Sequence, residues 1–555
     1  MNTPNPALVT QRAAQRLPRL ALFLFCAAYV LPGVFGRDPW KNADVTAFGA
    51  MLGIAEGRTS WLAPSVGGLP VDAAVLPYWL GAAFIALLQP LTGPALAARI
   101  PFALLLCVAL ALTWYASFHL ARTEAAQPLP FAFGGEANVV DYARAIADGA
   151  LLALIACLGL LQLGHETTPE LVQLAGAALF LYGMAASPYR ETLARLAVLF
   201  ALPVLAASGA PAIAVALSVV GSVVCRRSSY EAARRFAPWV LAGGALAVVA
   251  ATVLSAWDWR VGSYRTPQSV FSMLRLLVWF SWPAWPLALW TLWRWRAQLL
   301  NRHISVPLSS MLVALAACVA MGGSDRALLL GLPAIAVLAA FALPTLKRSL
   351  ASAIDWFSVF FFSSAALVIW VLYVSLQFGV PAKPAANVAK LAPGFVASFS
   401  IVSLAIAIVG TLAWAWLVKW RTGRHPQALW KSLVLPASGV ALNWLLLMTL
   451  LLPLLDYARS YRPLIQRLAK HVPLEACIAA PGMPRPHIAA LEYLGHYRVD
   501  ATSPADRTTC QYLMLVESIR APRPAPPGWK RMARERRPTD REEATAVFRR
   551  EAPAR

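Results

Sequence analysis

The feature that most constrains the fold of this chain is its series of long apolar stretches. A helix of about 20 mostly apolar residues spans the hydrocarbon core of a bilayer. Only 13% of the 555 residues are charged, against roughly 25% in soluble domains, which excludes a cytosolic enzyme or a disordered chain. We predict an all-α polytopic membrane protein with about thirteen spans. These lie near 17–35, 95–121, 146–164, 170–187, 193–209, 211–225, 236–256, 274–293, 305–321, 327–345, 353–378, 396–418 and 432–452.

The distribution of basic residues predicts the topology. The net charge of +22 could indicate nucleic-acid binding, but in a polytopic protein Lys and Arg gather in the cytoplasmic loops. Thirteen spans with a cytoplasmic N-terminus place most of the basic loops inside, and place the chain from about residue 456 outside. We therefore expect no nucleic-acid partner and a multi-pass membrane protein with a cytoplasmic N-terminus and an external C-terminus. The predicted inside loops carry Arg122, Arg144, Arg190, Arg226, Arg227, Arg234, Arg235, Arg294, Arg296, Arg302, Lys347, Arg348, Lys419, Arg421, Arg424 and Lys431.

Two apolar segments each allow two interpretations. The stretch from Leu76 to Leu88 is about three helical turns long, which favours a helix in the membrane interface over a crossing. Basic residues precede the apolar run that ends at Phe35, as in a signal peptide, but no small-residue cleavage site follows. We therefore assign this run to the first span.

The region beyond the last span reads as a small α+β domain over 456–520. A basic, Pro-rich tail follows over 521–555, and its composition predicts disorder. Cys477 and Cys510 are the two cysteines of this external region, so a disulfide between them is plausible in an oxidising compartment. The expected elements are helices over 461–472 and 487–494 and strands over 476–480 and 511–517.

The first external loop, with its interfacial helices, covers residues 36–94. It holds the carboxylates Asp38 and Asp44 directly after the first span. Carboxylates at the mouth of a span suit a general base acting at the membrane surface. A solvated loop with ordinary helix-capping residues would explain the same charges.

The order of motifs in this loop resembles that of the GT-C membrane glycosyltransferases. The acidic pair precedes a short helix ending in Met51-Leu52, a Gly-x-x-Trp-Leu-x-Pro segment over 57–64, and the sequence Leu-Pro-Tyr-Trp-Leu-Gly over 76–81. The resemblance is to the branch with the aminoarabinose transferase of lipid A and the protein O-mannosyltransferases. In weaker form it extends along the whole chain. The Lys-Pro that the family carries before its Tyr-Trp helix is absent.

The resemblance implies site residues, which we take position by position. The catalytic acidic residue of the family falls on Asp44, with Asp38 as the alternative. A second acidic position falls on Glu166, where a divalent metal could bind with His165 as a partner; helix capping would also explain this loop. Cations for the donor phosphate are expected from an external set of arginines. This set is Arg58, Arg260, Arg265 and Arg326.

The implied activity is that of an inverting, polyprenyl-phosphate-sugar-dependent glycosyltransferase. Its donor is an undecaprenyl-phosphate-type lipid-linked sugar, and its acceptor is a lipid A-like glycolipid, a polysaccharide or a protein on the periplasmic face. No cofactor is required, apart from the possible divalent metal. A secondary transporter or flippase, an O-antigen ligase or polymerase, and a scaffold without chemistry are the alternatives. Transporters place ionisable residues near the middle of their spans, and a ligase has a large external loop late in the chain, where this chain has only 379–395.

Overall fold

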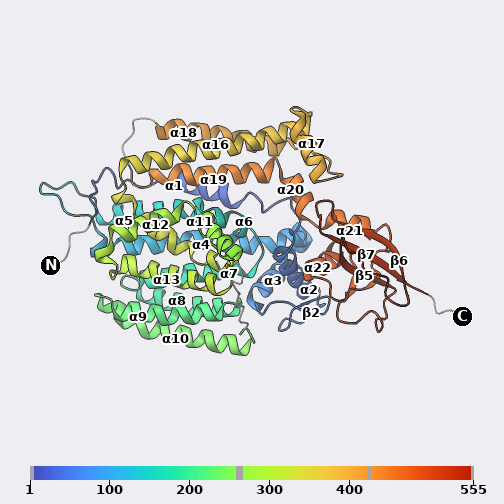
Figure 1. Ribbon diagram of the computed structural model, residues 1–555. Coiled ribbons are helices and arrows are strands. Elements are labelled where there is room, and N and C mark those ends of the chain that lie inside the picture. Colours follow the sequence, from blue (N-terminus) through green and yellow to red (C-terminus); the bar gives the residue numbers. More distant parts are fainter. Residues whose placement is uncertain (1–5, 258–266, 423–427, 552–555) are drawn as a thin grey trace. The chain divides into compact units, whose positions relative to one another are not determined.

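The computed structural model describes residues 6–257, 267–422 and 428–551 (Figure 1). The chain divides into two compact units, which are described separately below. Unit 1 comprises Met1–Pro32, Phe102–Leu367 and Ala405–Leu447. Unit 2 comprises Gly33–Pro101, Val368–Leu404 and Met448–Arg555.

Unit 1 is helical. In Figure 1 the helices α8, α9 and α10, coloured green, lie side by side and pack on one another. Small residues of α10 allow this close approach: a Cβ on Gly243 would lie 2.8 Å from the Val198 carbonyl oxygen in α8, and one on Gly244 would lie 2.1 Å from Ser218 in α9. The helices with all or most of their residues in unit 1 are α1 (Arg19–Val30), α4 (Pro94–Ala121), η1 (Glu124–Ala126), α5 (Val139–Ala156), α6 (Leu158–Leu163), α7 (Pro169–Ala186), α8 (Glu191–Ala207), α9 (Pro211–Arg226), α10 (Glu231–Val253), α11 (Pro267–Phe280), α12 (Ala284–Arg294), η2 (Arg296–Gln298), α13 (Arg302–Ala320), α14 (Asp325–Leu329), α15 (Leu332–Ala340), η3 (Leu343–Thr345), α16 (Arg348–Phe378), α18 (Ile401–Thr422) and α19 (Lys431–Thr449).

Eight described helices are long and apolar enough to cross a membrane, judged by length and composition. Other predicted spans occur as shorter or interrupted helices, because the chain bends within them. One such span breaks at Cys157, between α5 and α6. The eight are Val75–Thr92, Pro94–Ala121, Pro169–Ala186, Glu231–Val253, Arg302–Ala320, Arg348–Phe378, Ile401–Arg421 and Lys431–Thr449.

The helix predicted near Leu76–Leu88 is longer than expected. It is α3 (Val75–Thr92), with 18 residues. It continues through the Gln-Pro-Leu-Thr sequence and ends where Gly93 takes a φ of 76°, as glycine does at many helix C-termini. The predicted length is therefore wrong, and α3 meets the length and composition expected of a span.

Unit 2 contains a five-stranded sheet with the strand order β4-β3-β5-β7-β6. The strand β3 is parallel to both of its neighbours, whereas β7 is antiparallel to β5 and β6. The other elements of unit 2 precede or surround the sheet. Its elements are α2 (Ala43–Ala55), β1 (Ser65–Val66), β2 (Leu69–Pro70), α3, α17 (Ala382–Leu391), α20 (Leu452–Arg459), α21 (Arg462–Leu468), β3 (Cys477–Ala479), α22 (Arg485–Leu494), β4 (Arg498–Asp500), β5 (Tyr512–Ser518), β6 (Trp529–Glu535) and β7 (Glu543–Arg550).

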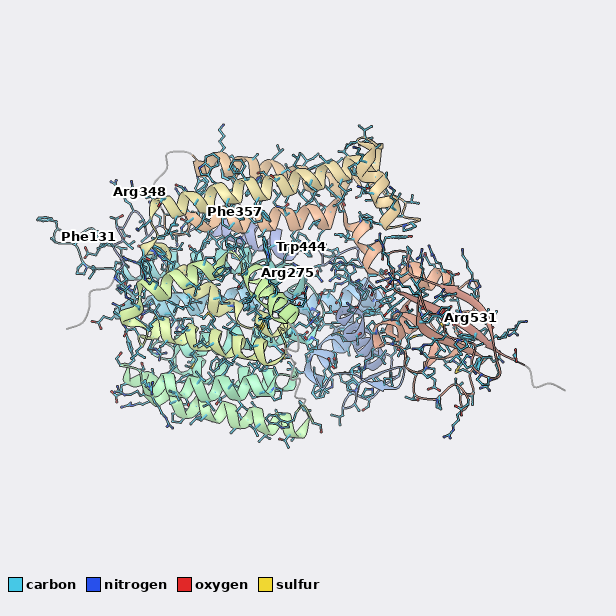
Figure 2. The ribbon with its side chains drawn as sticks, viewed as in Figure 1. Phe131, Arg275, Arg348, Phe357, Trp444 and Arg531 are labelled. Carbon is cyan, nitrogen blue, oxygen red and sulfur yellow. A yellow bond between two sulfur atoms is a disulfide. The ribbon has the colours of Figure 1, made fainter. Side chains whose placement is uncertain are left out.

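The helices and strands predicted within 456–520 are confirmed, and they correspond to α21, β3, α22 and β5. The prediction of a disordered tail over 521–555 is wrong for residues 529–550, which form β6 and β7. Trp529, Ala546 and Phe548 pack with Leu513 in the core of the sheet. Arginines within these strands make the composition of the tail basic. Two of them, Arg531 (labelled in Figure 2) and Arg534, pair with the buried carboxylate of Glu517.

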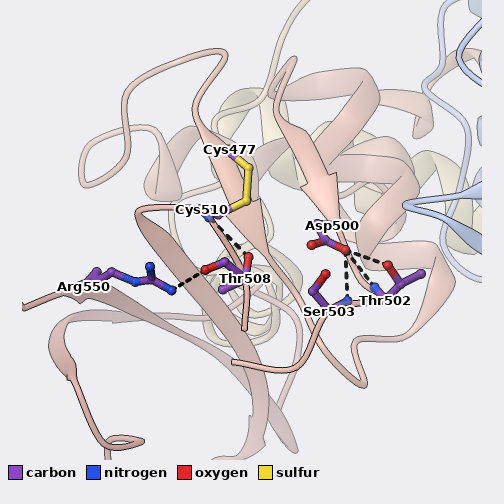
Figure 3. The surroundings of a disulfide bond; sticks show 7 residues. All are labelled: Cys477, Asp500, Thr502, Ser503, Thr508, Cys510 and Arg550. Atoms are coloured by element: carbon purple, nitrogen blue, oxygen red, sulfur yellow. Dashed lines mark hydrogen bonds between the residues drawn. A yellow bond between two sulfur atoms is a disulfide. The ribbon is translucent and has the colours of Figure 1, made fainter. Parts of the chain in front are cut away.

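A disulfide joins Cys477 at the start of β3 to Cys510 before β5, with the two Cα atoms 5.0 Å apart (Figure 3). The Cys510 N–H donates to Thr508 Oγ1 over 3.2 Å, and the Arg550 guanidinium donates to the Thr508 carbonyl. The disulfide at Cys510 and the Arg550 side chain of β7 thus both hold the segment 508–510 in place. Five other cysteines are free thiols: Cys26, Cys107, Cys157, Cys225 and Cys318.

The first loop packs on the helix α22 of the sheet domain. The helix α2 approaches so closely that a Cβ on Gly49 would lie 2.6 Å from the Ala489 Cβ. Beside this contact the rings of Phe48 and Tyr493 meet with centroids 4.7 Å apart. Two segments separated by more than 400 residues therefore form one packed layer, which holds the acidic end of α2 in place.

This close approach generates a prediction. Gly49→Leu should force α2 and α22 apart and lower the free energy of unfolding by about 1–3 kcal/mol, the usual cost of overpacking. The measurement is thermal unfolding of the purified full-length protein in detergent. Ala55→Leu, at the partly exposed last residue of α2, is the matched control. An unchanged melting temperature for Gly49→Leu would contradict the packing.

Candidate functional site

The carboxylate of Asp44 lies in the first turn of α2 and is only 1% exposed. Its Oδ2 atom accepts hydrogen bonds from the Arg37 guanidinium and from the Trp40 backbone N–H, each over 2.9 Å. The Arg37 cation also lies over the Trp40 ring, 4.6 Å from the centroid. A buried carboxylate needs such partners to remain ionised. The Arg37 side chain and the Trp40 backbone therefore hold the Asp44 carboxylate in a defined orientation.

Asp38 is held differently, by the segment that begins the sheet domain. The Arg462 guanidinium donates to both of its oxygens, and Ser460 Oγ donates to Oδ2 over 2.7 Å. A bidentate Arg–carboxylate pair fixes both distance and orientation. The interaction raises the pKa of Arg462. Asp38 thus ties the first loop to α21.

A third carboxylate, that of Asp456 in α20, completes the group. Its Oδ1 atom accepts from the Asp38 backbone N–H over 2.9 Å and from Trp40 Nε1 over 3.0 Å. Burial raises the pKa of Asp456, and the charge of Asp38 adds to this effect. The two hydrogen bonds and the charge of Arg37 oppose it. We call the set Arg37, Asp38, Trp40, Asp44, Arg99, Asp456, Arg459 and Arg462 the first-loop cluster.

Arg99 is the member that the sequence analysis missed. It lies near the start of α4 and is 4% exposed. Its Nη1 donates to the Val34 carbonyl over 3.3 Å, whereas its Nη2 has no hydrogen-bond partner among the described residues. Arg99 is within electrostatic reach of Asp44 and Asp456. The signal in the sequence was an arginine inside an apolar stretch, which is costly unless it has a function.

Tyr493 of α22 borders the same cluster. Burial raises the pKa of Tyr493, and so does the charge of Asp38, while Arg462 and Arg99 oppose this rise. The cluster contains four arginines and three aspartates, among them Arg459, whose guanidinium lies over the Trp40 ring, 5.0 Å from the centroid.

Arg58, a predicted phosphate ligand, pairs with carboxylates. Its guanidinium donates to Glu56 over 2.6 Å and to Glu492 of α22 over 2.9 Å. Glu492 also accepts from the Gly67 N–H in the β1–β2 turn over 3.1 Å. These contacts hold the hairpin on the sheet domain. The role of Arg58 toward a donor phosphate stays a prediction.

In unit 1 the structure brings Glu166 and Arg326 together. Arg326 Nη2 lies 3.0 Å from a Glu166 oxygen, and its Nη1 lies 2.8 Å from Glu170. Gln162 donates to the other Glu166 oxygen over 2.8 Å. The predicted acid and the predicted phosphate-binding cation are therefore partners of each other. Their roles toward a substrate stay predictions.

His165 contacts two backbone carbonyls and an aromatic ring. Its ring nitrogens lie 2.7 Å from the Leu161 carbonyl and 2.9 Å from the Tyr29 carbonyl. The ring also contacts Trp444 (labelled in Figure 2) at 4.7 Å between centroids. Within the described ranges, no group of three or more His, Cys, Asp or Glu side chains is placed to hold a metal. The role of His165 and Glu166 as metal ligands stays a prediction.

The remaining predicted phosphate ligands, Arg260 and Arg265, lie outside the described residues.

The raised pKa of Asp456 predicts a pH-dependent effect of Asp456→Asn. A carboxyl whose pKa is higher in the folded state makes the folded state bind more protons, so stability falls as the pH rises through that range. The asparagine keeps the accepting oxygen without the charge. We expect a higher melting temperature than the parent at pH 7.5, with a difference that shrinks as the pH falls toward 4.

The matched control is Asp506→Asn, at an exposed position of the same unit, which should leave the melting temperature unchanged. A lower melting temperature of Asp456→Asn at pH 7.5, or an advantage that grows at low pH, would contradict the assignment.

The comparisons with known proteins concern the fold. No protein-family model matches the chain, and no curated protein matches it in sequence. The chain is similar to the crystal structure of ArnT from Cupriavidus metallidurans bound to undecaprenyl phosphate, with a TM-score of 0.60, 15% identity, and coverage of 95% of this chain and 96% of that one. The apo structure of the same protein gives a TM-score of 0.61, 16% identity, and coverage of 95% and 97%.

An oligosaccharyltransferase from Archaeoglobus fulgidus, tethered with an acceptor peptide, gives a TM-score of 0.44, 11% identity, and coverage of 90% and 68%. This lower similarity carries no argument here. ArnT is an aminoarabinose transferase with the GT-C fold. The resemblance seen in the order of the sequence motifs is therefore confirmed at the level of the fold, and the chain has the GT-C fold.

Proposed function

We propose that this chain is a membrane glycosyltransferase that moves a sugar from a polyprenyl-phosphate donor to an acceptor hydroxyl. The ArnT-like fold supports the class of enzyme. The observation that carries the proposal is the first-loop cluster, where a buried carboxylate and a buried arginine with an unfilled donor occur together. A base and an anion-binding cation are the two groups that this reaction needs.

Asp44 is the proposed general base. Its carboxylate accepts the proton of the acceptor hydroxyl while the hydroxyl oxygen attacks the anomeric carbon. The bond from that carbon to the donor phosphate breaks, with inversion, and the phosphate leaves with its electron pair. The Arg37 ion pair favours the ionised form of Asp44, which is the form that a base requires.

Asp38 is the alternative base, and its contacts argue against that role. Both of its oxygens are engaged by Arg462, and Ser460 adds a third bond. A carboxylate in a bidentate pair must break strong bonds before it accepts a proton. We therefore assign Asp38 the role of positioning the first loop on the sheet domain.

Arg99 is the proposed ligand of the donor phosphate. A polyprenyl phosphate leaves as an anion, so its departure needs a cation more than a proton donor. The Lys-Pro that the resembled family carries before its Tyr-Trp helix is absent from this sequence. Arg99 supplies a fixed positive charge and an unfilled Nη2 in the same cluster. The undecaprenyl phosphate in the ArnT structure supports a donor lipid of this kind.

The setting that we propose is the periplasmic face of a bacterial inner membrane. Nucleotide sugars and ATP are absent there, and a lipid-linked donor brings its own leaving group. The acceptor is a cell-envelope molecule with a free hydroxyl, such as a lipid A-like glycolipid, a polysaccharide or a protein.

The central prediction concerns Asp44→Asn. Removal of the base should lower the rate of sugar transfer about 100-fold or more, while the amide can still accept the bonds from Arg37 and Trp40. The measurement is mass spectrometry of envelope glycolipids from cells that carry the variant in place of the parent. Asp72→Asn, at an exposed position in the same loop, is the matched control. Parent-like transfer by the Asp44→Asn variant would contradict the mechanism.

A second prediction separates donor binding from chemistry. Arg99→Gln should weaken binding of undecaprenyl phosphate about tenfold or more, because a charge-assisted contact to the phosphate is lost. Arg99→Lys should keep part of the affinity, since it keeps the charge. The measurement is the thermal shift of the purified protein on titration with undecaprenyl phosphate.

Arg498→Gln, an exposed arginine of β4 in the same unit, is the control and should bind as the parent does. Equal binding by Arg99→Gln and the parent would show that the phosphate lies elsewhere.

A further inference from the structure

A second group of buried cations lies in unit 1, at helix ends that the charge pattern predicts to face the cytoplasm. It is built from three segments. His119 and Arg122 come from the end of α4, Ser187 and Tyr189 from the connection between α7 and α8, and Arg302 from the start of α13. We call these five residues the Arg302 cluster.

Arg302 is the most buried of the cations, with 3% exposure. Its Nη2 donates to Ser187 Oγ over 3.0 Å and to the Met184 carbonyl. Cys225 also lies near the guanidinium. The Nε and Nη1 groups have no hydrogen-bond partner among the described residues. These two groups carry three N–H donors, and the Cys225 thiol is the polar side chain near them, so they have no oxygen acceptor in the described part of the chain.

The other members extend this group of donors toward the surface. The Arg122 guanidinium lies over the Tyr189 ring, 4.6 Å from the centroid, and its Nε has no partner in the described part of the chain. His119 stacks on Tyr189, with centroids 5.6 Å apart, and its Nδ1 also has no partner there. Burial raises the pKa of Tyr189 to about 12, although Arg122 and Arg302 both oppose the rise. The positive charges of Arg122 and Arg302 therefore both act on the Tyr189 side chain.

The charges of this cluster are not balanced by protein groups. Across residues 6–257, 267–422 and 428–551, neither Arg122 nor Arg302 forms an ion pair with a carboxylate. A buried cation without a counter-charge is strongly destabilising. Buried donors without acceptors add to this cost. The α13 N-terminus adds a partial positive charge at the same place. A bound anion would satisfy all of these groups.

We propose that the Arg302 cluster binds a phosphate-type anion. Guanidinium groups bind phosphate oxygens through paired N–H donors. Arg122 is half-buried, so the cluster reaches the surface on the side predicted to face the inner leaflet. Basic sites between helices on that side bind anionic lipid headgroups. The phosphate comes from a phospholipid headgroup or from free phosphate. This site is independent of the first-loop cluster and of the proposed sugar transfer.

The test measures thermal unfolding of the full-length protein in a neutral detergent with two probes, phosphatidylglycerol and inorganic phosphate. The parent should be stabilised by at least one of them. Arg302→Gln should weaken the response about tenfold or more in midpoint concentration, and Arg122→Gln should also weaken it. Stabilisation by phosphatidylglycerol alone identifies a lipid headgroup, and stabilisation by inorganic phosphate identifies a free anion.

Three controls keep the test decisive. Arg227→Gln, at an exposed position on the same predicted side, should respond as the parent does. Diacylglycerol, which has acyl chains without phosphate, and sodium chloride at equal ionic strength should not stabilise. If Arg302→Gln does not fold, Arg122→Gln decides the outcome. Absence of any phosphate response in the parent, parent-like responses of the Arg302→Gln and Arg122→Gln variants, or equal stabilisation by diacylglycerol would overturn the proposal.

Discussion

The close packing of α2 on α22 determines the arrangement of the first-loop cluster. Gly49 removes the side chain that would separate the two helices, and Glu492 accepts bonds from both the hairpin and Arg58. With this layer formed, Arg462 and Asp456 reach Asp38 and Trp40. Asp38 and Asp456 therefore depend on a contact between segments far apart in the sequence, whereas Asp44 is held by Arg37 and Trp40 of the same loop. Residues 37–42 form no helix or strand, so the contacts with this layer hold them in place.

Several features could be read from the sequence because they depend on local pattern. Long apolar runs indicated the helices, the short apolar run within 511–517 indicated β5, and the motif order of the first loop indicated the GT-C fold. The burial of Asp44 could not be read in this way. An aspartate after a span looks the same whether it caps a helix or lies under a folded loop, and the difference comes from Arg37 and Trp40 around it.

Two differences between the predictions and the structure have physical causes. The arginine-rich composition of the tail predicts disorder, but Arg531 and Arg534 pair with Glu517, and Trp529, Ala546 and Phe548 pack in the core of the sheet. Arg99 lies within an apolar stretch, so the pattern of apolar residues does not single it out as a site residue. The metal role of the adjacent residues His165 and Glu166 stays a prediction. The two side chains have different partners in the structure, namely backbone carbonyls for His165 and Arg326 for Glu166.

The sheet order has a consequence for biosynthesis. The strand β7 (Glu543–Arg550) lies between β5 and β6, so these five strands are all paired only after residues 543–550 have been synthesised. Asp38 and Asp456 are 418 positions apart, and ribosomes add about 5–20 residues per second. The first loop must therefore wait roughly 20–80 seconds for its packing partners. During this interval Asp38 lacks its partners Arg462, Ser460 and Asp456, so the first-loop cluster is assembled only after both segments have been synthesised.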